Sequence, residues 1–148
     1  MIYLDASAFV SLFVTDAHSG RIRGLLRTGH PSVAVSTFGL IEFAAAVSTR
    51  DRAGRLAFGQ AATILLQADA WIAAQATTVE VEPADHRVAA THVRRFDLGL
   101  RAPDALHLAT CARLGLPLLT FDLRQAAAAT ALGLALAPAG VDPAGAGP

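Results

Sequence analysis

The sequence predicts a three-layer α/β/α sandwich with a central parallel sheet. Short apolar runs alternate with longer segments of helical periodicity along nearly the whole chain, which is typical of β–α–β units. The length of 148 residues and the 53% share of hydrophobic residues suit one domain with a single core. Because helices cover both faces of a parallel sheet, the short apolar runs are expected to be buried strands.

The expected strands are short apolar or β-branched runs. The first is apolar and ends on an aspartate, and the third alternates polar and apolar residues, which indicates a partly exposed strand. In chain order, the strands are expected at residues 2–5, 32–36, 77–82, 117–121 and 134–136.

The expected helices follow from apolar spacing and from residues that begin or end a helix. Thr37 fits an N-cap, Pro83 fits a first helical turn, and Gly115 and Gly133 fit helix ends. The helices are expected at residues 7–14, 17–27, 38–49, 56–74, 83–95, 104–114 and 123–132.

One domain is expected at residues 1–137, followed by a flexible tail rich in Gly, Pro and Ala at residues 138–148. The N-terminal apolar run has no basic segment before it, so a signal peptide is not expected. The longest uncharged stretch, residues 125–141, is interrupted by glycine and proline, so a membrane span is not expected either. These features lead us to expect a cytoplasmic protein.

The charged residues exclude several classes of protein. Twelve basic residues balance twelve acidic ones, which does not support a general nucleic-acid-binding protein with a strongly basic surface. Every basic residue is Arg, so a catalytic Lys and a Gly-rich phosphate loop ending in Lys are excluded. Aspartyl phosphotransferases and phosphoacceptor receiver domains rank far behind for the same reason. The single Cys111 cannot form an internal disulfide and is expected to be a small buried residue.

Four acidic residues occur in apolar surroundings, where a carboxylate is costly unless it is paired or binds a metal. Asp5 and Asp122 end two expected strands, Asp104 opens a helix, and Glu42 lies inside an apolar helix. The carboxyl ends of parallel strands and the N-termini of the following helices share one edge of the sheet. We therefore predict that the fold gathers these acids around a hard cation, which prefers oxygen ligands.

Structural roles also fit some of these residues. Asp5, Asp104 and Asp122 each suit a helix N-terminus, whereas Glu42 has no basic partner within one helical turn. Ser7 and Thr120 could orient a carboxylate or a metal-bound water, or could serve in capping and strand packing.

The five histidines are dispersed and show no zinc-site spacing. His107 follows Asp104 by about one helical turn, so it is the one histidine that we consider as a candidate site residue.

These residues resemble a known family. Tyr3–Ser7, Glu42, the stretch Leu100–Ala109 and Leu119–Asp122 look like the corresponding motifs of PIN-domain ribonucleases, and the single-domain form is similar to the VapC toxins of toxin–antitoxin pairs. The resemblance covers residues 1 to about 136. It implies that Asp5, Glu42, Asp104 and Asp122 bind Mg²⁺ or Mn²⁺. It further implies that a metal-activated water attacks phosphorus in line and leaves a 3′-hydroxyl and a 5′-phosphate on the RNA.

The resemblance also implies partners. It predicts a homodimer and inhibition by a cognate VapB-type antitoxin whose tail enters or covers the acidic groove. The expected activity is that of an endoribonuclease toxin, and the alternative is a non-catalytic PIN-like protein-binding module. Candidate RNA contacts, for which solvated helix faces are the competing interpretation, are Arg50, Arg52, Arg55, Arg94, Arg95 and Arg101.

Overall fold

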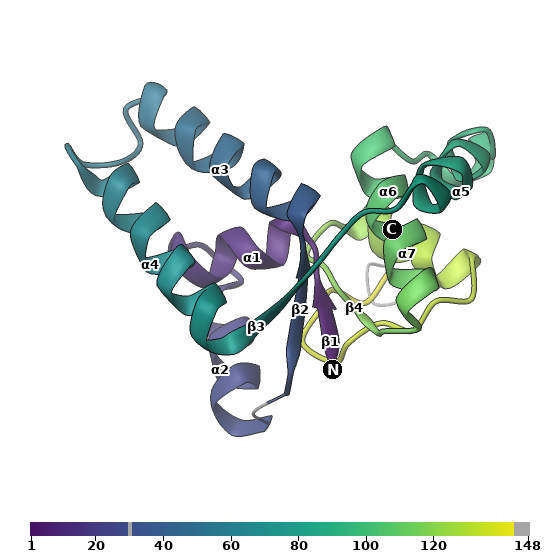
Figure 1. Ribbon diagram of the computed structural model, residues 1–148, viewed down its shortest axis with the longest axis horizontal. Coiled ribbons are helices and arrows are strands. Elements are labelled where there is room, and N and C mark those ends of the chain that lie inside the picture. The colour runs from purple at the N-terminus through teal and green to yellow at the C-terminus, as the bar shows by residue number, and fades with distance from the viewer. Residues whose placement is uncertain (30, 144–148) are drawn as a thin grey trace.

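The structure is a computed structural model that describes residues 1–29 and 31–143. Its sheet has four parallel strands in the order β3-β2-β1-β4 (Figure 1). The strands are β1 (Ile2–Leu4), β2 (Val33–Ser36), β3 (Ala76–Val79) and β4 (Leu118–Leu119). The predicted parallel sheet is therefore confirmed, with the first strand of the chain in its interior.

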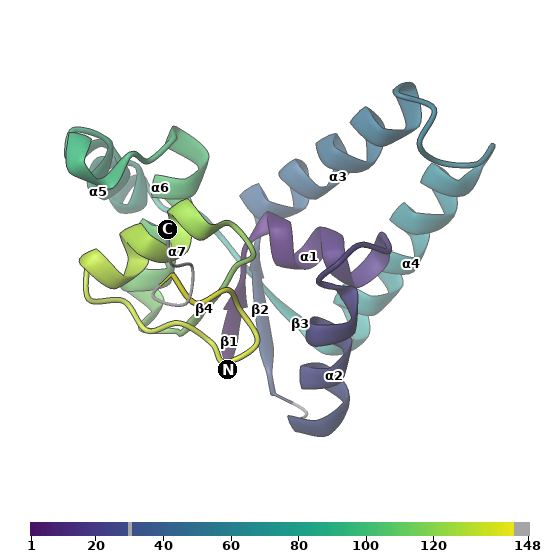
Figure 2. The same cartoon turned by 180° about the vertical axis from the view of Figure 1, so that it is seen from behind.

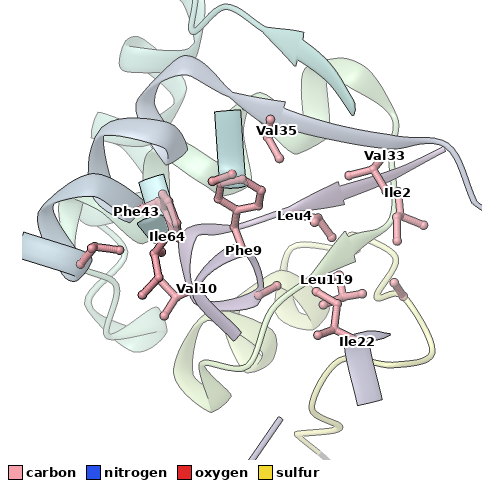
Figure 3. Close-up of a cluster of buried hydrophobic side chains, with 14 residues drawn as sticks. Ile2, Leu4, Phe9, Val10, Ile22, Val33, Val35, Phe43, Ile64 and Leu119 are labelled. Atoms are coloured by element: carbon pink, nitrogen blue, oxygen red, sulfur yellow. The ribbon is translucent and has the colours of Figure 1, made fainter. Parts of the chain in front are cut away.

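Side chains of the central strands alternate between two cores, as the two-residue period of a strand requires. Ile2 and Leu4 point into a core that Phe9 fills (Figure 3). Tyr3 between them belongs to the core on the opposite side of the sheet. The helices that build the first core are α1 (Ala6–Phe13), α2 (Ser19–Gly29), α3 (Thr37–Arg52) and α4 (Gln60–Gln75).

The second face of the sheet is covered by helices from the C-terminal half of the chain. Leu108 and Cys111 of one helix and Ala128 of another pack against Tyr3. Figures 1 and 2 show this group on the opposite side of the sheet from α1 to α4, which gives the predicted three layers. The elements are α5 (Pro83–Val93), the 3₁₀ helix η1 (Phe96–Leu98), α6 (Ala102–Leu114) and α7 (Leu123–Ala131).

Three expected strands were wrong in extent, and the one expected at residues 117–121 is limited to Leu118–Leu119. The strand expected at residues 77–82 ends at Val79, because its partner Ser36 is the last residue of β2 and already caps α3. The strand expected at residues 134–136 is a single bridge between Leu136 and Leu118. Pro138, which has no N–H to donate, follows this bridge closely.

Several helix starts also differ from expectation, among them that of α2, which begins at Ser19 and not at residue 17. The helix expected at residues 56–74 begins at Gln60, because Gly59 adopts the left-handed conformation (φ 74°) immediately before it. The helix expected to open at Asp104 begins two residues earlier at Ala102, with Pro103 in its first turn.

The expected tail, residues 138–148, is described only as far as Pro143. The Val141 N–H donates to the Thr120 carbonyl over 3.1 Å, and Arg21 donates to the Gly140 carbonyl over 2.7 Å. The first part of this segment is therefore attached to the domain, and residues 144–148 lie outside the described residues. Among the helices of the described ranges, none has both the length and the apolar character of a transmembrane segment.

Candidate active site at the carboxyl edge of the sheet

The central strands deliver polar side chains to the carboxyl edge of the sheet. Asp5 follows the last residue of β1, Ser36 ends β2, and Thr120 follows the last residue of β4. Because β1 lies between β2 and β4, the Asp5 carboxylate has polar neighbours on both sides.

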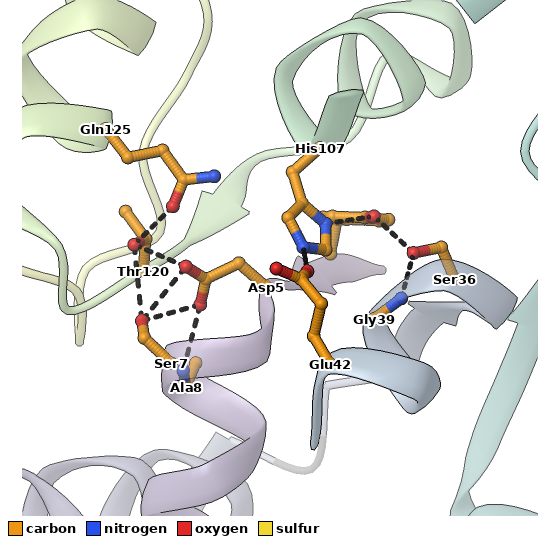
Figure 4. A network of polar contacts seen from close by, with 10 residues as sticks. Asp5, Ser7, Ala8, Ser36, Gly39, Glu42, His107, Thr120 and Gln125 are labelled. Carbon is orange, nitrogen blue, oxygen red and sulfur yellow. Dashed lines mark hydrogen bonds and ion pairs between the residues drawn. The ribbon is translucent and has the colours of Figure 1, made fainter. Parts of the chain in front are cut away.

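Asp5 is only 4% exposed and is held by hydrogen bonds from three residues (Figure 4). Its Oδ1 accepts from the Ala8 N–H and from Ser7 Oγ, both over 2.8 Å, and its Oδ2 accepts from Thr120 Oγ1 over 2.7 Å. Burial raises the pKa of Asp5, and the nearby His107 and these hydrogen bonds oppose that rise. Asp5 is thus the N-cap of α1 and also a fixed carboxylate at the sheet edge.

Glu42 has a partner that its local sequence does not reveal. Its Oε2 lies 2.6 Å from His107 Nε2, although 65 residues separate the two in the chain. On the other side of the ring, His107 Nδ1 lies 2.8 Å from the Tyr3 hydroxyl, which in turn bonds to Ser36 Oγ over 2.9 Å. This buried chain of side chains links β1, β2, α3 and α6.

Tyr3 and Ser36 were not among the predicted site residues. Tyr3 lies between two apolar residues and Ser36 follows an apolar run, so a polar group at each of these strand positions was an available signal. Gly39 supports the same cluster by its small size, because a Cβ at this position would lie 3.2 Å from His107 Cε1 and 3.3 Å from Ser36 Oγ.

The two remaining acids both bond to backbone N–H groups at helix N-termini. Asp122 Oδ1 accepts from the N–H groups of Arg124 and Gln125 at the start of α7. Asp104 Oδ2 accepts from the Arg101 N–H over 3.3 Å at the start of α6. Burial raises the pKa of Asp104, and the charge of Asp122 raises it further. The two carboxylates are therefore close enough to repel each other.

Gln125 is a further polar residue at this edge that the sequence analysis missed. It is 1% exposed, its Oε1 lies 2.8 Å from Thr120 Oγ1, and its buried Nε2 has no hydrogen-bond partner within residues 1–29 and 31–143. Its place three residues after Asp122, within an alanine-rich helix, was the available signal.

The chemistry of the site suits a hard cation, because the donors are carboxylates and two of them, Asp5 and Asp104, have raised pKa values in its absence. Across residues 1–29 and 31–143, however, no three His, Cys, Asp or Glu side chains converge closely enough to hold a metal as they stand. In this arrangement Glu42 is turned to His107 and Asp5 to its hydroxyl donors.

A cavity of about 380 Å³ opens beside Glu42, the one of the four acids that lines it. Glu42 and Ser7 line it, together with Arg50, whose guanidinium also bonds to the Ala46 carbonyl. The other five arginines proposed as RNA contacts, which are all exposed and do not line this cavity, are Arg52, Arg55, Arg94, Arg95 and Arg101.

Comparisons with known proteins agree with this architecture. The family model described as PIN domain matches residues 2–131. Ribonuclease VapC46 of Mycobacterium tuberculosis (strain ATCC 25618 / H37Rv) is 34% identical over 138 residues, which are 91% of this chain and 95% of that protein.

Solved structures show the same fold. Mycobacterium tuberculosis VapC20, described as a sarcin-ricin loop cleaving toxin, superposes with a TM-score of 0.70 at 20% identity and covers 93% of this chain and 98% of its own. A toxin–antitoxin complex from Klebsiella pneumoniae gives a TM-score of 0.57 at 18% identity, with 97% and 98% of the two chains covered. The family match over most of the sequence, together with the VapC46 relationship, shows that this chain belongs to the PIN-domain family.

Proposed function

We propose that this protein is a metal-dependent endoribonuclease that acts as the toxin of a toxin–antitoxin pair. The observation that carries the proposal is the similarity to Ribonuclease VapC46 along nearly the full length of both chains. The buried carboxylate at the end of the central strand supports it, because a folded protein keeps such a group only where other groups stabilise its charge. Since RNA is the proposed substrate, the cytoplasm is the proposed place of action.

The proposed metal ligands are Asp5, Glu42, Asp104 and Asp122, and the proposed ion is Mg²⁺ or Mn²⁺. When bound, such an ion supplies Lewis-acid activation of the phosphodiester and a more acidic water. Ser7 and Thr120 orient the Asp5 carboxylate through their hydroxyl groups.

His107 restrains the Glu42 carboxylate through its Nε2 atom. Bonds of this kind fix the direction in which a carboxylate presents its free oxygens.

Among the candidate RNA contacts, Arg50 is the one we place first, because it shares a cavity with Glu42. Two others already have partners on their own segments. Arg95 forms an exposed ion pair with Asp97, and Arg52 bonds to Ser48 and Thr49. Arg55, Arg94 and Arg101 remain candidates for more distant phosphates.

Two separate apolar surfaces support the proposed partners, a VapB-type antitoxin and a second copy of the chain. One lies on α3, α4 and the segment between them, where Ile41, Phe58 and Leu66 are 67%, 108% and 70% exposed. The other is a mostly apolar groove of about 630 Å³ along α5 and α6 that includes Val93 and Leu106. Exposed apolar surface of this extent is typical of protein interfaces.

The test is cleavage of total RNA by the purified protein in Mg²⁺ or Mn²⁺, beside a chelator control, Asp5→Ala and Glu42→Gln. Glu42→Gln has nearly the same shape and keeps an acceptor for His107, so it removes charge with little change in packing. Asp69→Asn, on the exposed surface of α4, is the matched control. We expect discrete products from the wild type and from Asp69→Asn alone, and mapping of their ends identifies the cleaved bond.

Equal cleavage by the wild type, Asp5→Ala and Glu42→Gln would contradict the proposal. The non-catalytic protein-binding module would then be the better interpretation, since its acids have no role on RNA.

A further inference from the structure

We propose that the cavity beside Glu42 is a binding site for one nucleobase of the RNA, next to the phosphodiester that is cut. In this assignment His18 and Phe121 form the surface on which the base stacks, and Arg50 contacts a backbone phosphate. The inference rests on the proposed ribonuclease activity and adds to it the means by which the substrate strand is held.

The first observation is an aromatic pair that joins two distant parts of the chain. The rings of His18 and Phe121 are stacked, with centroids 4.4 Å apart and planes 10° from parallel. Both side chains are only partly buried, and both line the cavity. Single-stranded RNA is held by stacking of unpaired bases on aromatic rings of this kind.

The second observation is that hydrogen bonds fix the backbone on both sides of this pair. The His18 N–H donates to Asp16 Oδ1 over 2.8 Å, and Asp16 Oδ2 accepts from Ser11 Oγ of α1 over 2.7 Å. The Phe121 N–H donates to Ser7 Oγ over 2.8 Å. The stacking surface is thus formed before RNA binds, so binding costs little ordering of the protein.

The third observation is that one side chain connects this stacking surface to Asp5, a proposed metal ligand. Ser7 holds the Phe121 backbone and also donates to Asp5, so one side chain connects the aromatic pair to the buried carboxylate. Phe121 lies between Thr120 and Asp122 in the chain. The stacking surface is therefore joined through a single residue to the carboxylate of the proposed chemistry.

The fourth observation is a positive charge in the wall of the cavity. Arg50 lies eight residues after Glu42 on α3, which corresponds to about 12 Å along a helix. Within the described residues only Nη1 of its guanidinium forms a hydrogen bond, to Ala46. The remaining N–H groups suit a phosphate oxygen, which guanidinium groups bind well.

The experiment uses the full chain and single-stranded RNA 12-mers in which 2-aminopurine occupies each position in turn. The fluorescence of 2-aminopurine falls when this base stacks, so binding is followed in chelator, where the RNA stays intact. Cleavage of the same RNA is then measured with Mn²⁺ to obtain KM and kcat separately. The variants are His18→Ala, His18→Phe and Arg50→Gln, and His86→Ala on exposed α5 is the control.

We expect quenching at one position with the wild type and with His86→Ala. His18→Ala should lose this quenching and raise both Kd and KM roughly 5- to 100-fold, the loss of one stacked base, with kcat nearly unchanged. His18→Phe should restore both. Arg50→Gln should weaken binding. It should also lower the slope of log Kd against log salt concentration by about one, which corresponds to the loss of one phosphate contact.

The inference is overturned if the wild type cuts RNA but quenches no position, or if His18→Ala behaves as the wild type does. It is also overturned if His18→Phe fails to restore binding, because the ring would then not be the relevant feature. Absence of metal-dependent cleavage by the wild type would instead remove the ribonuclease assignment, and this inference with it.

Discussion

Glu42 is oriented by His107, whose other ring nitrogen bonds to the Tyr3 hydroxyl. The imidazole is 3% exposed and uses both ring nitrogens, one for the Glu42 carboxylate and one for the Tyr3 hydroxyl. Burial of polar groups is tolerated here because each has a partner, and removal of one member leaves another unsatisfied. Single substitutions at His107 and Tyr3 can therefore distinguish an effect on the orientation of Glu42 from an effect on the stability of the fold.

His107→Ala should lower the free energy of unfolding by about 3 kcal/mol, because it creates a cavity and leaves the Tyr3 hydroxyl with one partner fewer. It should also lower the cleavage rate roughly 10- to 100-fold, the usual effect of losing a group that orients a metal ligand.

Tyr3→Phe is the matched control, since it should cost about 1–2 kcal/mol while the contact between His107 and Glu42 stays. Chemical denaturation and initial cleavage rates, measured where circular dichroism shows each variant folded, check both predictions. Equal loss of rate in the two variants would mean that His107 acts only through stability.

Asp104→Asn should stabilise the metal-free protein while it abolishes cleavage. The folded-state pKa of Asp104 is raised by burial and by the charge of Asp122, so at neutral pH its ionised form opposes folding. Asparagine removes that charge and keeps an acceptor for the Arg101 N–H.

We expect the melting temperature in chelator to rise by about 1–3 °C and cleavage to fall roughly 100-fold or more. A clear fall in melting temperature would show that the carboxylate of Asp104 serves mainly as a helix cap.

The sequence was informative about these residues to the extent that their signals are local. An acid at the end of an apolar run is visible at Asp5, and so is its capping geometry. The sequence does not reveal the partner of Glu42, because contact between α3 and α6 is set by packing across the carboxyl edge and not by spacing in the chain. Histidine has no strong preference for burial, so His107 gave no decisive sign of its role.

At the scale of elements, one buried carboxylate joins the two helices of the outer layer. Asp85 in the first turn of α5 is 1% exposed and accepts hydrogen bonds from Arg113 and Thr110 of α6. Burial alone would raise its pKa, but the bonds from Arg113, from the Glu82 N–H and from Thr110 outweigh burial and lower it. The stability of the packing between α5 and α6 therefore depends on pH.

A lowered folded-state pKa means that Asp85 stabilises the fold above the ordinary carboxyl pKa of about 4 and loses this effect as pH falls through the lower, folded value. Asp85→Asn should cost about 2 kcal/mol at pH 7, and the difference from the wild type should shrink below pH 4. Urea denaturation at several pH values measures it.

Asp97→Asn is the control, because Arg95 also lowers the pKa of Asp97 but that pair is exposed. A pH-independent difference for Asp85→Asn would contradict the linkage.

Element types followed the sequence more closely than element limits did. Periodicity located the helices, because their apolar faces repeat along a continuous segment. The strands were harder to bound, since the length of β3 depends on where its neighbour β2 turns into a helix. The Leu136 bridge depends similarly on β4, so residues 134–136 could not be judged from their own composition.

For the whole molecule, a ligand that binds only the folded state must stabilise it. Mg²⁺ or Mn²⁺ at about one hundred times its dissociation constant should add about 2.7 kcal/mol, because mass action favours the state that binds the ion. Thermal melts with increasing metal measure this without reference to activity. Asp104→Asn should reduce the rise, and Asp69→Asn should leave it intact; an equal rise in both would place the ion elsewhere.

The strand order has a consequence for synthesis of the protein on the ribosome. Asp5 receives its Thr120 hydrogen bond from a residue 115 positions later, and β1 pairs with β4 only when that late segment is present. A nascent chain that has reached β2 can pair β1 on one side, but its other edge stays open. Translation proceeds from the N-terminus, so the proposed nuclease has no complete active site until most of the polypeptide has left the ribosome that makes it.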